Sequence, residues 1–238
     1  MAVGVGVGPR KKVLLSWSSG KDSAWALHLL RQREDVEVVA LVTSFNESVG
    51  RVAMHAVRRE LVRMQAERAG LPLWEVALPW PCSNVEYERL MADVWTRARQ
   101  EGIEAVVFGD LYLREIRAYR ETQLIGTGLE ALFPVWGLPT RALADDMLAE
   151  GVRAVVTCVD PRQLAEAFAG REFDQRMLAE LPATVDPCGE NGEFHTFCYA
   201  SPVFHAPIPI EVGEIVRRDG FCFADVVARA VEADPLIA

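Results

Sequence analysis

The sequence predicts an α/β protein in which a parallel sheet with helices on its faces is followed by a smaller α+β domain. In the first half, short apolar runs alternate with longer segments whose apolar residues recur at helical spacing. Glycines or clusters of polar residues separate these segments. From about Thr127 onward the chain changes character and becomes rich in short apolar runs punctuated by prolines, which is typical of short strands.

The first half is expected to contain four strands and three helices. The strands are expected in the apolar runs 13–15, 36–44, 73–78 and 105–108. The helices are expected directly after Gly20, at 51–69, and from a cap at Asn84 to Gly102. Strands that alternate with helices in this way form a parallel sheet with right-handed crossovers.

The second half is expected to be a distinct small domain, which divides the chain into residues 1–127 and 128–238. The expected elements are a strand at 131–136, a helix at 142–148, a buried strand at 152–159, a helical stretch from about 162 to 181, a polar irregular segment at 184–195 and short strands between 197 and 227. The sequence has no low-complexity linker and no internal repeat. The two parts are therefore expected to pack closely.

The overall composition excludes some classes of protein. The chain has 238 residues, a formal net charge of −9 and a pI near 5.1, which argues against a nucleic-acid binder that works through general electrostatic attraction. No apolar run is long enough to span a membrane, and the basic residues after the glycine–valine tail do not fit a secretory signal. The five scattered cysteines suit reduced thiols and a cytoplasmic location.

Residues 13–23 have the pattern of an anion-binding loop. A short apolar strand ends at a cluster of hydroxyl residues, and a helical pattern starts directly after Gly20. This geometry directs backbone N–H groups and the positive end of a helix at an anion, while a glycine lets the backbone approach closely. The hydroxyl groups that could donate to phosphate oxygens are those of Ser16, Ser18, Ser19 and Ser23.

The identity of neighbouring residues decides which kind of loop this is. Lys21 is followed by Asp22, so the Walker motif does not match, and the three-glycine dinucleotide motif is absent. The segment resembles the loop of the PP-loop ATP pyrophosphatases, Ser-Gly-Gly-x-Asp-Ser, with Ser19 in place of a glycine. That resemblance implies a Rossmann-like sheet of the PP-loop (HUP) type. Asp22 is expected to hold a Mg²⁺ ion that bridges the phosphates, and Lys21 to offset their charge. An ordinary turn, with Asp22 favoured by the helix dipole, is the alternative.

Two further places are expected to lie beside this loop. Ligands of parallel sheets sit beyond the carboxyl ends of the strands. This rule selects Ser44, within the polar segment 43–47 after the second strand, together with Gly109 and Asp110 after the fourth. Asp110 is a candidate to assist the metal or the ribose.

A second polar cluster occupies residues 186–196, with the sequence DPCGENGEFHT. Glu190, Glu193 and His195 lie close together along the chain, and glycines between them permit tight turns. Acids beside a histidine can serve proton transfer, metal binding or the binding of an amine. A hairpin turn at Asn191–Gly192 with its polar residues in water is the alternative.

The two clusters together resemble the diphthine–ammonia ligase family, which joins a PP-loop domain to a domain with a Glu-Gly-Gly-Glu-[Phe/Tyr]-x-Thr motif. Asn191 departs from that motif at its first glycine, and His195 stands where the family often has an acid. The resemblance implies an ATP-dependent ligase with Mg²⁺. It would activate a carboxylate as an acyl adenylate, with release of pyrophosphate, and amidate it with ammonia. The family's acceptor is diphthine of elongation factor 2. Lys21, Asp22, Glu190 and Glu193 become the candidate catalytic residues, and a homodimer is considered.

Two other functions remain open at this level. A PP-loop enzyme could adenylate a different acceptor, either a small carboxylate or a nucleic-acid base, although the acidic charge and the lack of a CxxC pair disfavour tRNA thiolation. A non-catalytic adenine-nucleotide-binding protein is the second alternative. Such a protein has no evident need for Asp22 or for the acidic cluster.

Overall fold

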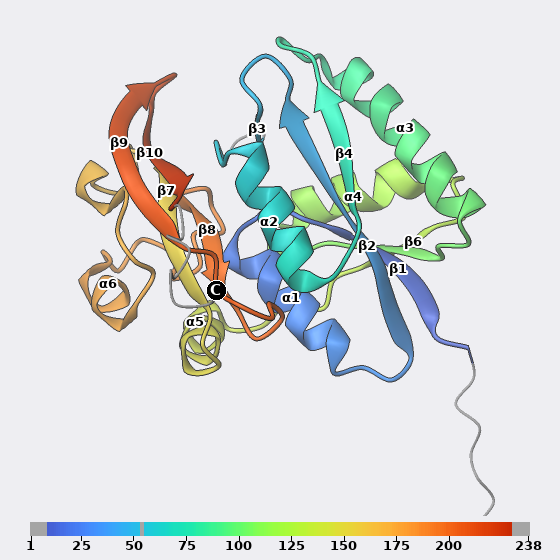
Figure 1. The fold of residues 1–238 in the computed structure, drawn as a ribbon, viewed down its shortest axis with the longest axis horizontal. Coiled ribbons are helices and arrows are strands. Elements are labelled where there is room, and N and C mark those ends of the chain that lie inside the picture. Colours follow the sequence, from blue (N-terminus) through green and yellow to red (C-terminus); the bar gives the residue numbers. More distant parts are fainter. Residues whose placement is uncertain (1–8, 53–54, 230–238) are drawn as a thin grey trace, which may run out of the picture.

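The computed structural model describes residues 9–52 and 55–229, and two sheets lie side by side in it (Figure 1). Residues 1–8 of the expected N-terminal tail, and Met54 of the expected second helix, lie outside the described residues. In the described part of the chain, no helix is both long and apolar enough to cross a membrane.

The first sheet confirms the predicted α/β class. Its strands are β1 (Lys11–Ser16), β2 (Val36–Asn46), β3 (Arg51–Val52), β4 (Leu73–Leu78), β5 (Ala105–Val107) and β6 (Glu130–Leu132). The order is β3-β2-β1-β5-β6, and β4 also pairs with β2. All pairs are parallel except β2 with β3. The direction of winding therefore reverses between β1 and β5, which is where ligands of such sheets bind.

Four helices cover the first sheet: α1 (Lys21–Arg31), α2 (Arg59–Ala69), α3 (Asn84–Gln100) and α4 (Arg114–Leu124). Alternation along β1 divides the core in two, since Val13 and Leu15 join one hydrophobic cluster and Leu14 joins the other. The first cluster includes residues of α1, α2 and the second sheet, whereas the second includes residues of α3 and α4. One continuous core therefore links both sheets.

The second sheet is antiparallel, in the order β8-β7-β10-β9. Its strands are β7 (Arg153–Val159), β8 (Phe194–Ala200), β9 (Ile210–Arg218) and β10 (Phe221–Ala228), and the helices α5 (Thr140–Ala149), η1 (Glu166–Phe168) and α6 (Gln175–Glu180) accompany it. This matches the predicted smaller α+β part. The sheet of the first half continues past residue 127 to β6, and the division at 127/128 stays a prediction.

Three expected elements are wrong. The helix expected at 51–69 begins only at Arg59, because Val52 pairs with Phe45 as part of β3. The strand expected at 131–136 ends at Leu132, since the chain turns there and the amide of Trp136 donates to the carbonyl of Phe133.

The helical stretch expected to reach residue 181 is also wrong, because only η1 and α6 are helical there. Asp174 starts α6 by accepting the amide of Met177 at 2.7 Å. The cap of α3 is Ser83 and not Asn84, since the Ser83 hydroxyl accepts the amide of Glu86 at 3.2 Å.

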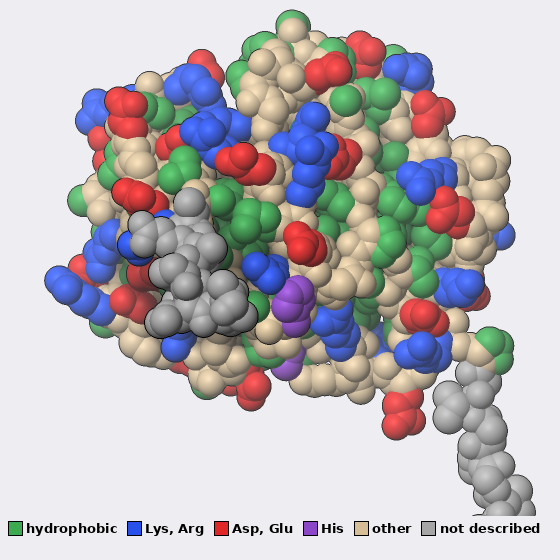
Figure 2. Space-filling model, viewed as in Figure 1, with side chains coloured by type: hydrophobic (Ala, Val, Ile, Leu, Met, Phe, Trp, Pro, Cys, Tyr) green, Lys and Arg blue, Asp and Glu red, His purple; other side chains and the backbone are tan. Residues whose placement is uncertain are grey.

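Figure 2 shows one face of the molecule, where acidic and basic side chains of the described residues are interspersed. Neither sign of charge forms a continuous patch on this face.

Candidate functional site

The predicted phosphate loop lies where the sheet reverses its direction of winding. It follows β1, and the segment after β5 lies directly beside it: a Cβ atom added at Gly109 would lie 3.4 Å from the backbone of Asp22 and Ser23. Gly20 is the N-cap of α1 and has no side chain of its own that could cap this helix end. Apart from the amide of Lys21, which bonds to Thr196, the first turn of α1 therefore offers its backbone N–H groups and a positive dipole end to an anion.

Strand β8 of the second sheet holds this loop in place. The amide of Cys198 donates to the carbonyl of Ser19 at 2.9 Å, and the amide of Lys21 donates to the hydroxyl of Thr196 at 3.2 Å. A Cβ atom at Gly20 would lie 3.2 Å from the carbonyl oxygen of Thr196. A side chain at position 20 would thus press on β8, which explains why the loop needs a glycine there.

The hydroxyl residues of the loop occupy different environments. Ser18 and Ser23 bond to each other at 3.2 Å, and Ser23 also donates to the carbonyl of Gly20 at 3.0 Å. Ser19 has a φ of 71°, a left-handed conformation that favours glycine. This backbone explains the glycine that the PP-loop pattern places at this position.

The remaining candidates of the phosphate-binding set lie farther along the strands. Ser16 is the last residue of β1 and is half-buried. Ser44 lies inside β2, opposite Val76 of β4, and not in the loop that follows the strand.

A buried glutamine of α2, which sequence reasoning missed, holds the loop in place through hydrogen bonds. Gln65 of α2 accepts the indole N–H of Trp17 at 2.8 Å and donates to the carbonyl oxygens of Ser19 and Cys198. Gln65 is fully buried. Its side chain therefore joins the loop, α2 and β8 in one hydrogen-bond network. The helical pattern around it gave no sign of this role, because a single glutamine within a helix is usually exposed.

Three carboxylates gather beside the loop. Asp22 is the second residue of α1, Asp110 follows β5, and Glu190 comes from the turn before β8. Glu190 accepts the amides of Leu111 and Tyr112 at 2.7 and 3.2 Å. Burial and, to a smaller extent, the charges of Asp22 and Asp110 together raise the pKa of Glu190 to about 7, although these two hydrogen bonds oppose the rise.

Asp110 carries an incompletely satisfied charge. Its Oδ2 atom is buried without a hydrogen-bond partner among the described residues, and Arg120 lies 3.7 Å away. Burial raises the pKa of Asp110, and the negative charge of Asp22 adds to this effect. The carboxylates of Asp22, Asp110 and Glu190 offer hard oxygen donors of the kind that Mg²⁺ prefers. The described residues contain no ready-made group of three ligands, so a Mg²⁺ ion here would need further oxygens, such as those of phosphate and water.

Lys21 lies buried at the junction of the two sheets. Its ammonium donates to the Asp22 carboxylate at 3.0 Å and to the carbonyl of Cys188, and it sits near the faces of Phe173 and Phe194. Burial lowers the pKa of Lys21, but the negative charge of Asp22 and other nearby groups outweigh this and leave it raised. The ammonium thus stays charged next to the loop.

Glu193 organises the polar turn. One carboxylate oxygen accepts the amide of Asp186 at 2.9 Å and the side-chain amide of Asn191 at 2.8 Å. The other oxygen is buried without a hydrogen-bond partner in the described part of the chain. Among the predicted catalytic residues, the structure brings Lys21, Asp22 and Glu190 together, whereas Glu193 lies within the turn that carries Glu190.

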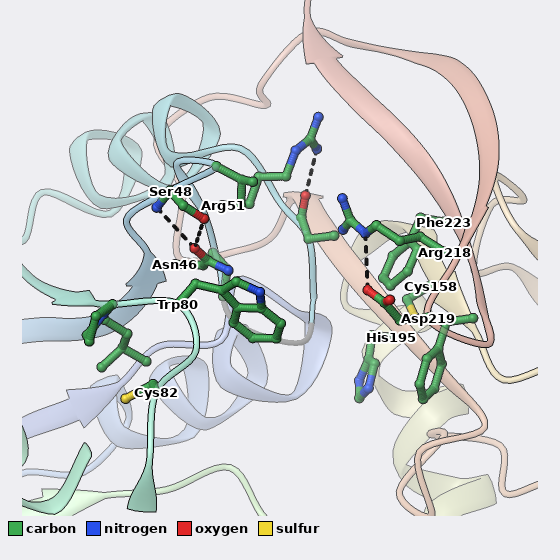
Figure 3. Close-up of a pocket in the computed structure, with 16 residues that line it drawn as sticks. Asn46, Ser48, Arg51, Trp80, Cys82, Cys158, His195, Arg218, Asp219 and Phe223 are labelled. Carbon is green, nitrogen blue, oxygen red and sulfur yellow. Dashed lines mark hydrogen bonds and ion pairs between the residues drawn. The ribbon is translucent and has the colours of Figure 1, made fainter. Parts of the chain in front are cut away.

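A cavity of about 340 Å³ opens next to the loop, between the two sheets (Figure 3). Asn46, Arg51 and Trp80 line its wall on the side of the first sheet, and His195 and Phe223 lie on the facing wall. Sequence reasoning did not find this cavity, since its walls come from segments that are far apart in the chain. The full lining is Asn46, Ser48, Val49, Arg51, Val52, Ala56, Leu78, Pro79, Trp80, Cys82, Cys158, His195, Arg218, Asp219, Phe221 and Phe223.

At the base of this cavity wall, His195 packs against His55, with ring centroids 4.4 Å apart. Burial and the positive charge of Lys21 lower the pKa of His195 to about 4, and the negative charge of Glu193 opposes this. Burial also lowers the pKa of His55 well below its usual range, with further contributions from His195 and Lys21. Both imidazoles are therefore neutral near pH 7.

Comparison with known families decides the relationship of this chain. The model of the diphthamide synthase N-terminal domain matches residues 11–129, and that of the diphthamide synthase C-terminal domain matches residues 140–231. The chain belongs to the diphthamide synthase family. The resemblance drawn from the two sequence motifs is thereby confirmed.

Curated members of the diphthamide synthase family are similar to the chain at low identity. A protein of Schizosaccharomyces pombe named diphthine–ammonia ligase is 26% identical over 91% of this chain, which spans 39% of that protein. Proteins of the same name from Bos taurus and Homo sapiens are each 23% identical over 88% of this chain and 86% of their own length. Both parts matched by the family models contribute to the site, the first through the phosphate loop and the second through Glu190 and Thr196.

Proposed function

We propose that the chain is an ATP-dependent ligase that activates a carboxylate as an acyl adenylate and amidates it with ammonia. The observation that carries this proposal is the position of the phosphate loop, at the reversal point of the sheet and beside the carboxylates of Asp22, Asp110 and Glu190. The family and the names of its curated members support a reaction that joins ammonia to a carboxylate.

The loop binds the phosphates of ATP in this proposal. The first turn of α1 offers the backbone N–H groups that follow Lys21, and the hydroxyls of Ser18 and Ser23 lie beside it. Asp22 is the residue proposed to hold Mg²⁺, with Asp110 beside it as a second oxygen donor. A bound Mg²⁺ would supply positive charge that stabilises the pyrophosphate leaving group. Lys21 holds Asp22 in place and adds positive charge near the loop.

The reaction proceeds in two steps. A carboxylate oxygen of the acceptor attacks the α-phosphorus of ATP, the bond to the bridging oxygen breaks, and pyrophosphate leaves with the electron pair. The nitrogen of ammonia then attacks the acyl carbon, the bond to the AMP oxygen breaks, and AMP leaves with its electron pair. An ammonium ion loses two protons on the way to the amide.

Glu190 is proposed to take the first of these protons, and the second passes to solvent. A carboxylate with a pKa of about 7 is close to the working pH, which is the condition for efficient proton transfer. Glu193 positions this group, because its carboxylate closes the turn that carries Glu190. The acceptor is proposed to be diphthine of elongation factor 2, in line with the names of the relatives, and the homodimer stays a prediction.

Thermal unfolding with ATP, GTP and AMP, each with and without Mg²⁺, tests the nucleotide site. ATP at a hundred times its dissociation constant should add about 2.7 kcal/mol to the free energy of unfolding. In Asp22→Asn the additional effect of Mg²⁺ should be lost. Asp93→Asn is the matched control, because the Asp93 side chain is 77% exposed on α3. Equal stabilisation of both variants by ATP with Mg²⁺ would contradict the role of Asp22.

Release of pyrophosphate separates the ligase from a protein that only binds nucleotide. With the acceptor and ammonium present, wild type should release pyrophosphate and AMP in equal amounts and form one amide for each. Glu190→Gln should slow amide formation more than pyrophosphate release, since Glu190 acts after adenylation. Tight ATP binding without any pyrophosphate release would favour the non-catalytic alternative.

A further inference from the structure

A second and much smaller cavity lies on the face of the first sheet that α3 and α4 cover. Its volume is about 20 Å³, which is enough for one water-sized molecule and too small for a nucleotide. The sheet contributes Ser16, the last residue of β1, and Phe108, which directly follows β5, and side chains of α3 and α4 form the remaining walls. The cavity therefore lies at the carboxyl edge of β1 and β5, where the winding of the sheet reverses.

The indole of Trp95 brings a buried hydrogen-bond donor to this small cavity. Trp95 lines the cavity and is only 5% exposed, and its Nε1–H group has no hydrogen-bond partner among the described residues. Its other surroundings belong to the apolar cluster of α3 and α4, which offers no acceptor. Because a buried N–H group without a partner destabilises a fold, the indole points to a ligand in the cavity that accepts a hydrogen bond.

A charged pair with unsatisfied atoms lies at the side of the small cavity. Arg120 lines the cavity, and its Nε atom lies 3.7 Å from the Oδ2 atom of Asp110, which is too far for a hydrogen bond. Both atoms are buried without a partner in the part of the chain that the structure describes. The hydroxyl of Ser16 adds a group that can donate as well as accept. The cavity thus offers its ligand both donors and acceptors.

This mixture of groups selects a small neutral ligand. A metal cation or an ammonium ion has no lone pair for the N–H group of Trp95, and the guanidinium of Arg120 repels it. A halide ion accepts hydrogen bonds but is repelled by the carboxylate of Asp110. Ammonia meets both requirements, because its lone pair accepts from Trp95 and its N–H groups donate to oxygens such as that of Ser16. Water has the same hydrogen-bonding capacity, so the two must be distinguished by experiment.

The small cavity lies directly beside the proposed reaction site. Ser16 comes two residues before Ser18 of the phosphate loop, and Phe108 comes two residues before Asp110. Asp110 belongs to the group of three carboxylates, whose negative charge attracts an ammonium ion. In the proposed reaction Glu190 takes the first proton of this ion, and the ammonia that results is the form that fits the cavity.

We propose that the small cavity between α3 and α4 binds the ammonia of the ligase reaction and holds it beside Asp110 until the acyl adenylate has formed. The N–H group of Trp95 donates to the nitrogen of ammonia, and the volume of the cavity excludes larger amines. The nucleophile is thereby kept neutral and away from bulk water. This inference rests on the proposed ligase function, since it assigns the position of the second substrate of that reaction.

Titration with ammonium chloride at pH 8, followed by ¹H–¹⁵N NMR of the indole groups, tests the binding of ammonia without any turnover. The chain has six tryptophans, and the signal of Trp95 is the one that disappears in Trp95→Phe. We expect this signal to shift with ammonium chloride and to keep its position with equal concentrations of sodium chloride. An equal shift with sodium chloride would mean a halide site, and no shift with either salt would mean a structural water only. Either result would overturn the proposal.

Kinetics of amide formation test whether the indole N–H group serves ammonia in particular. Trp95→Phe keeps an aromatic ring and removes the N–H group, so the KM for ammonium should rise about fivefold while the KM for ATP stays unchanged. Trp74→Phe is the matched control, because Trp74 is buried in the same apolar cluster and does not line the cavity. The same KM for ammonium in both variants would contradict the role of Trp95.

Methylamine tests the size of the cavity. Its nitrogen is at least as nucleophilic as that of ammonia, so a preference for ammonia reports the fit. Wild type should use ammonia with a kcat/KM at least about tenfold higher than that for methylamine. Met91→Ala enlarges the cavity and should reduce this preference, whereas Met147→Ala, at a buried methionine of α5 outside the cavity, should keep it. An unchanged preference in Met91→Ala would overturn the proposal.

Exchange of pyrophosphate into ATP keeps failure of the ammonia site apart from failure of the proposed function. The exchange requires the acceptor and no ammonia, so Trp95→Phe should catalyse it at the wild-type rate. Exchange by wild type together with an unshifted Trp95 signal would refute the ammonia site alone. A Trp95 signal that shifts with ammonium chloride, without exchange under any condition, would refute the ligase reaction and leave the binding of ammonia in place.

Discussion

Replacement of Glu190 by Gln tests the electrostatics of the carboxylate group directly. Glutamine has almost the same shape, and its carbonyl oxygen can still accept the amides of Leu111 and Tyr112. The substitution therefore removes a charge that burial and, less strongly, the charges of Asp22 and Asp110 disfavour, and it leaves the hydrogen bonds in place. The expected result is a variant whose stability depends less on pH than that of wild type.

The magnitude follows from the pKa of Glu190. It is about 7 in the folded chain, against 4.5 for an ordinary glutamate. A difference of about 2.5 units corresponds to about 3.4 kcal/mol at most, since one unit is 1.36 kcal/mol. Because the Glu190 side chain is only half-buried, solvent screens part of this, and about 2 kcal/mol is expected.

The sign is set by the raised pKa. The folded state favours the protonated form of Glu190, so its contribution to stability is full below pH 4.5 and is lost as the pH rises through about 7. At pH 8, Glu190→Gln should therefore be more stable than wild type by about 2 kcal/mol, and at pH 5 the difference should fall below about 1 kcal/mol.

Urea unfolding at pH 5, 6, 7 and 8 measures this difference. Glu115→Gln is the control, because Glu115 is exposed on α4 and should follow the wild-type curve. Parallel curves for wild type and Glu190→Gln would refute the reasoning, since they would mean that the carboxylate is not buried beside Asp22 and Asp110 in solution. Saturating ATP with Mg²⁺ should reverse the difference at pH 8, because the carboxylate group then faces positive charge.

Three other substitutions test the contacts that hold the site together, each by urea unfolding. Gln65→Leu leaves the indole N–H of Trp17 buried without an acceptor and should lower the free energy of unfolding by about 3 kcal/mol; an unchanged midpoint would rule out the network. Asp225→Asn should cost about 1 kcal/mol at pH 7, because the ion pair with Arg58 is partly exposed. This loss should disappear as the pH falls toward the Asp225 pKa of about 2, and a loss that is constant with pH would speak against an ion pair. Ser19→Gly relieves a left-handed backbone at φ 71° and should stabilise the chain by up to about 1 kcal/mol, whereas destabilisation would mean that the Ser19 side chain contributes a contact.

The strands of the first sheet could be predicted because their local pattern and their final environment agree. The apolar run at 73–78 is a strand with the same bounds in the structure, and the strand expected at 13–15 lies within β1. The run at 13–15 is buried on both faces of the sheet and must therefore be apolar throughout, whereas β4 alternates buried and exposed residues as a strand covered on one face does. No partner elsewhere in the chain is needed to recognise them.

The short hairpin at β3 shows where this reasoning fails. Val52 and Val57 are both buried, and Val57 lies four residues before Leu61, so it continues the apolar pattern of α2. A helix was therefore expected, but the amide of Val52 donates to the carbonyl of Val57 and Val52 also pairs with Phe45. Spacing along the chain cannot distinguish these cases, because the pairing with β2 decides between them.

Some residues of the candidate site could likewise be predicted from the sequence, and others could not. Residues 18–23 and Glu190 could be found, since the first form a continuous motif and the second belongs to a recognisable cluster. Gln65, Trp80 and Arg218 could not be found. Gln65 bonds to residues that are distant in the chain, and Trp80 and Arg218 line a cavity whose other walls come from distant segments, so none of the three stands out in its local sequence.

The contacts around the phosphate loop also bear on how the two halves of the chain work together. The backbone of Ser19 and of Lys21 bonds to β8, and the Lys21 ammonium bonds to the carbonyl of Cys188. Gly20, which lies between them, leaves no room for a side chain beside Thr196. Three consecutive loop residues therefore depend on the second half of the chain. A loop that binds phosphate must hold its N–H groups in a fixed direction, and here the second half of the chain supplies that constraint. A substitution in β8 should therefore alter the affinity for ATP even though β8 follows the motif by more than a hundred residues. The proposed phosphate site would in this sense depend on both halves of the chain, on either side of the predicted division at residue 127.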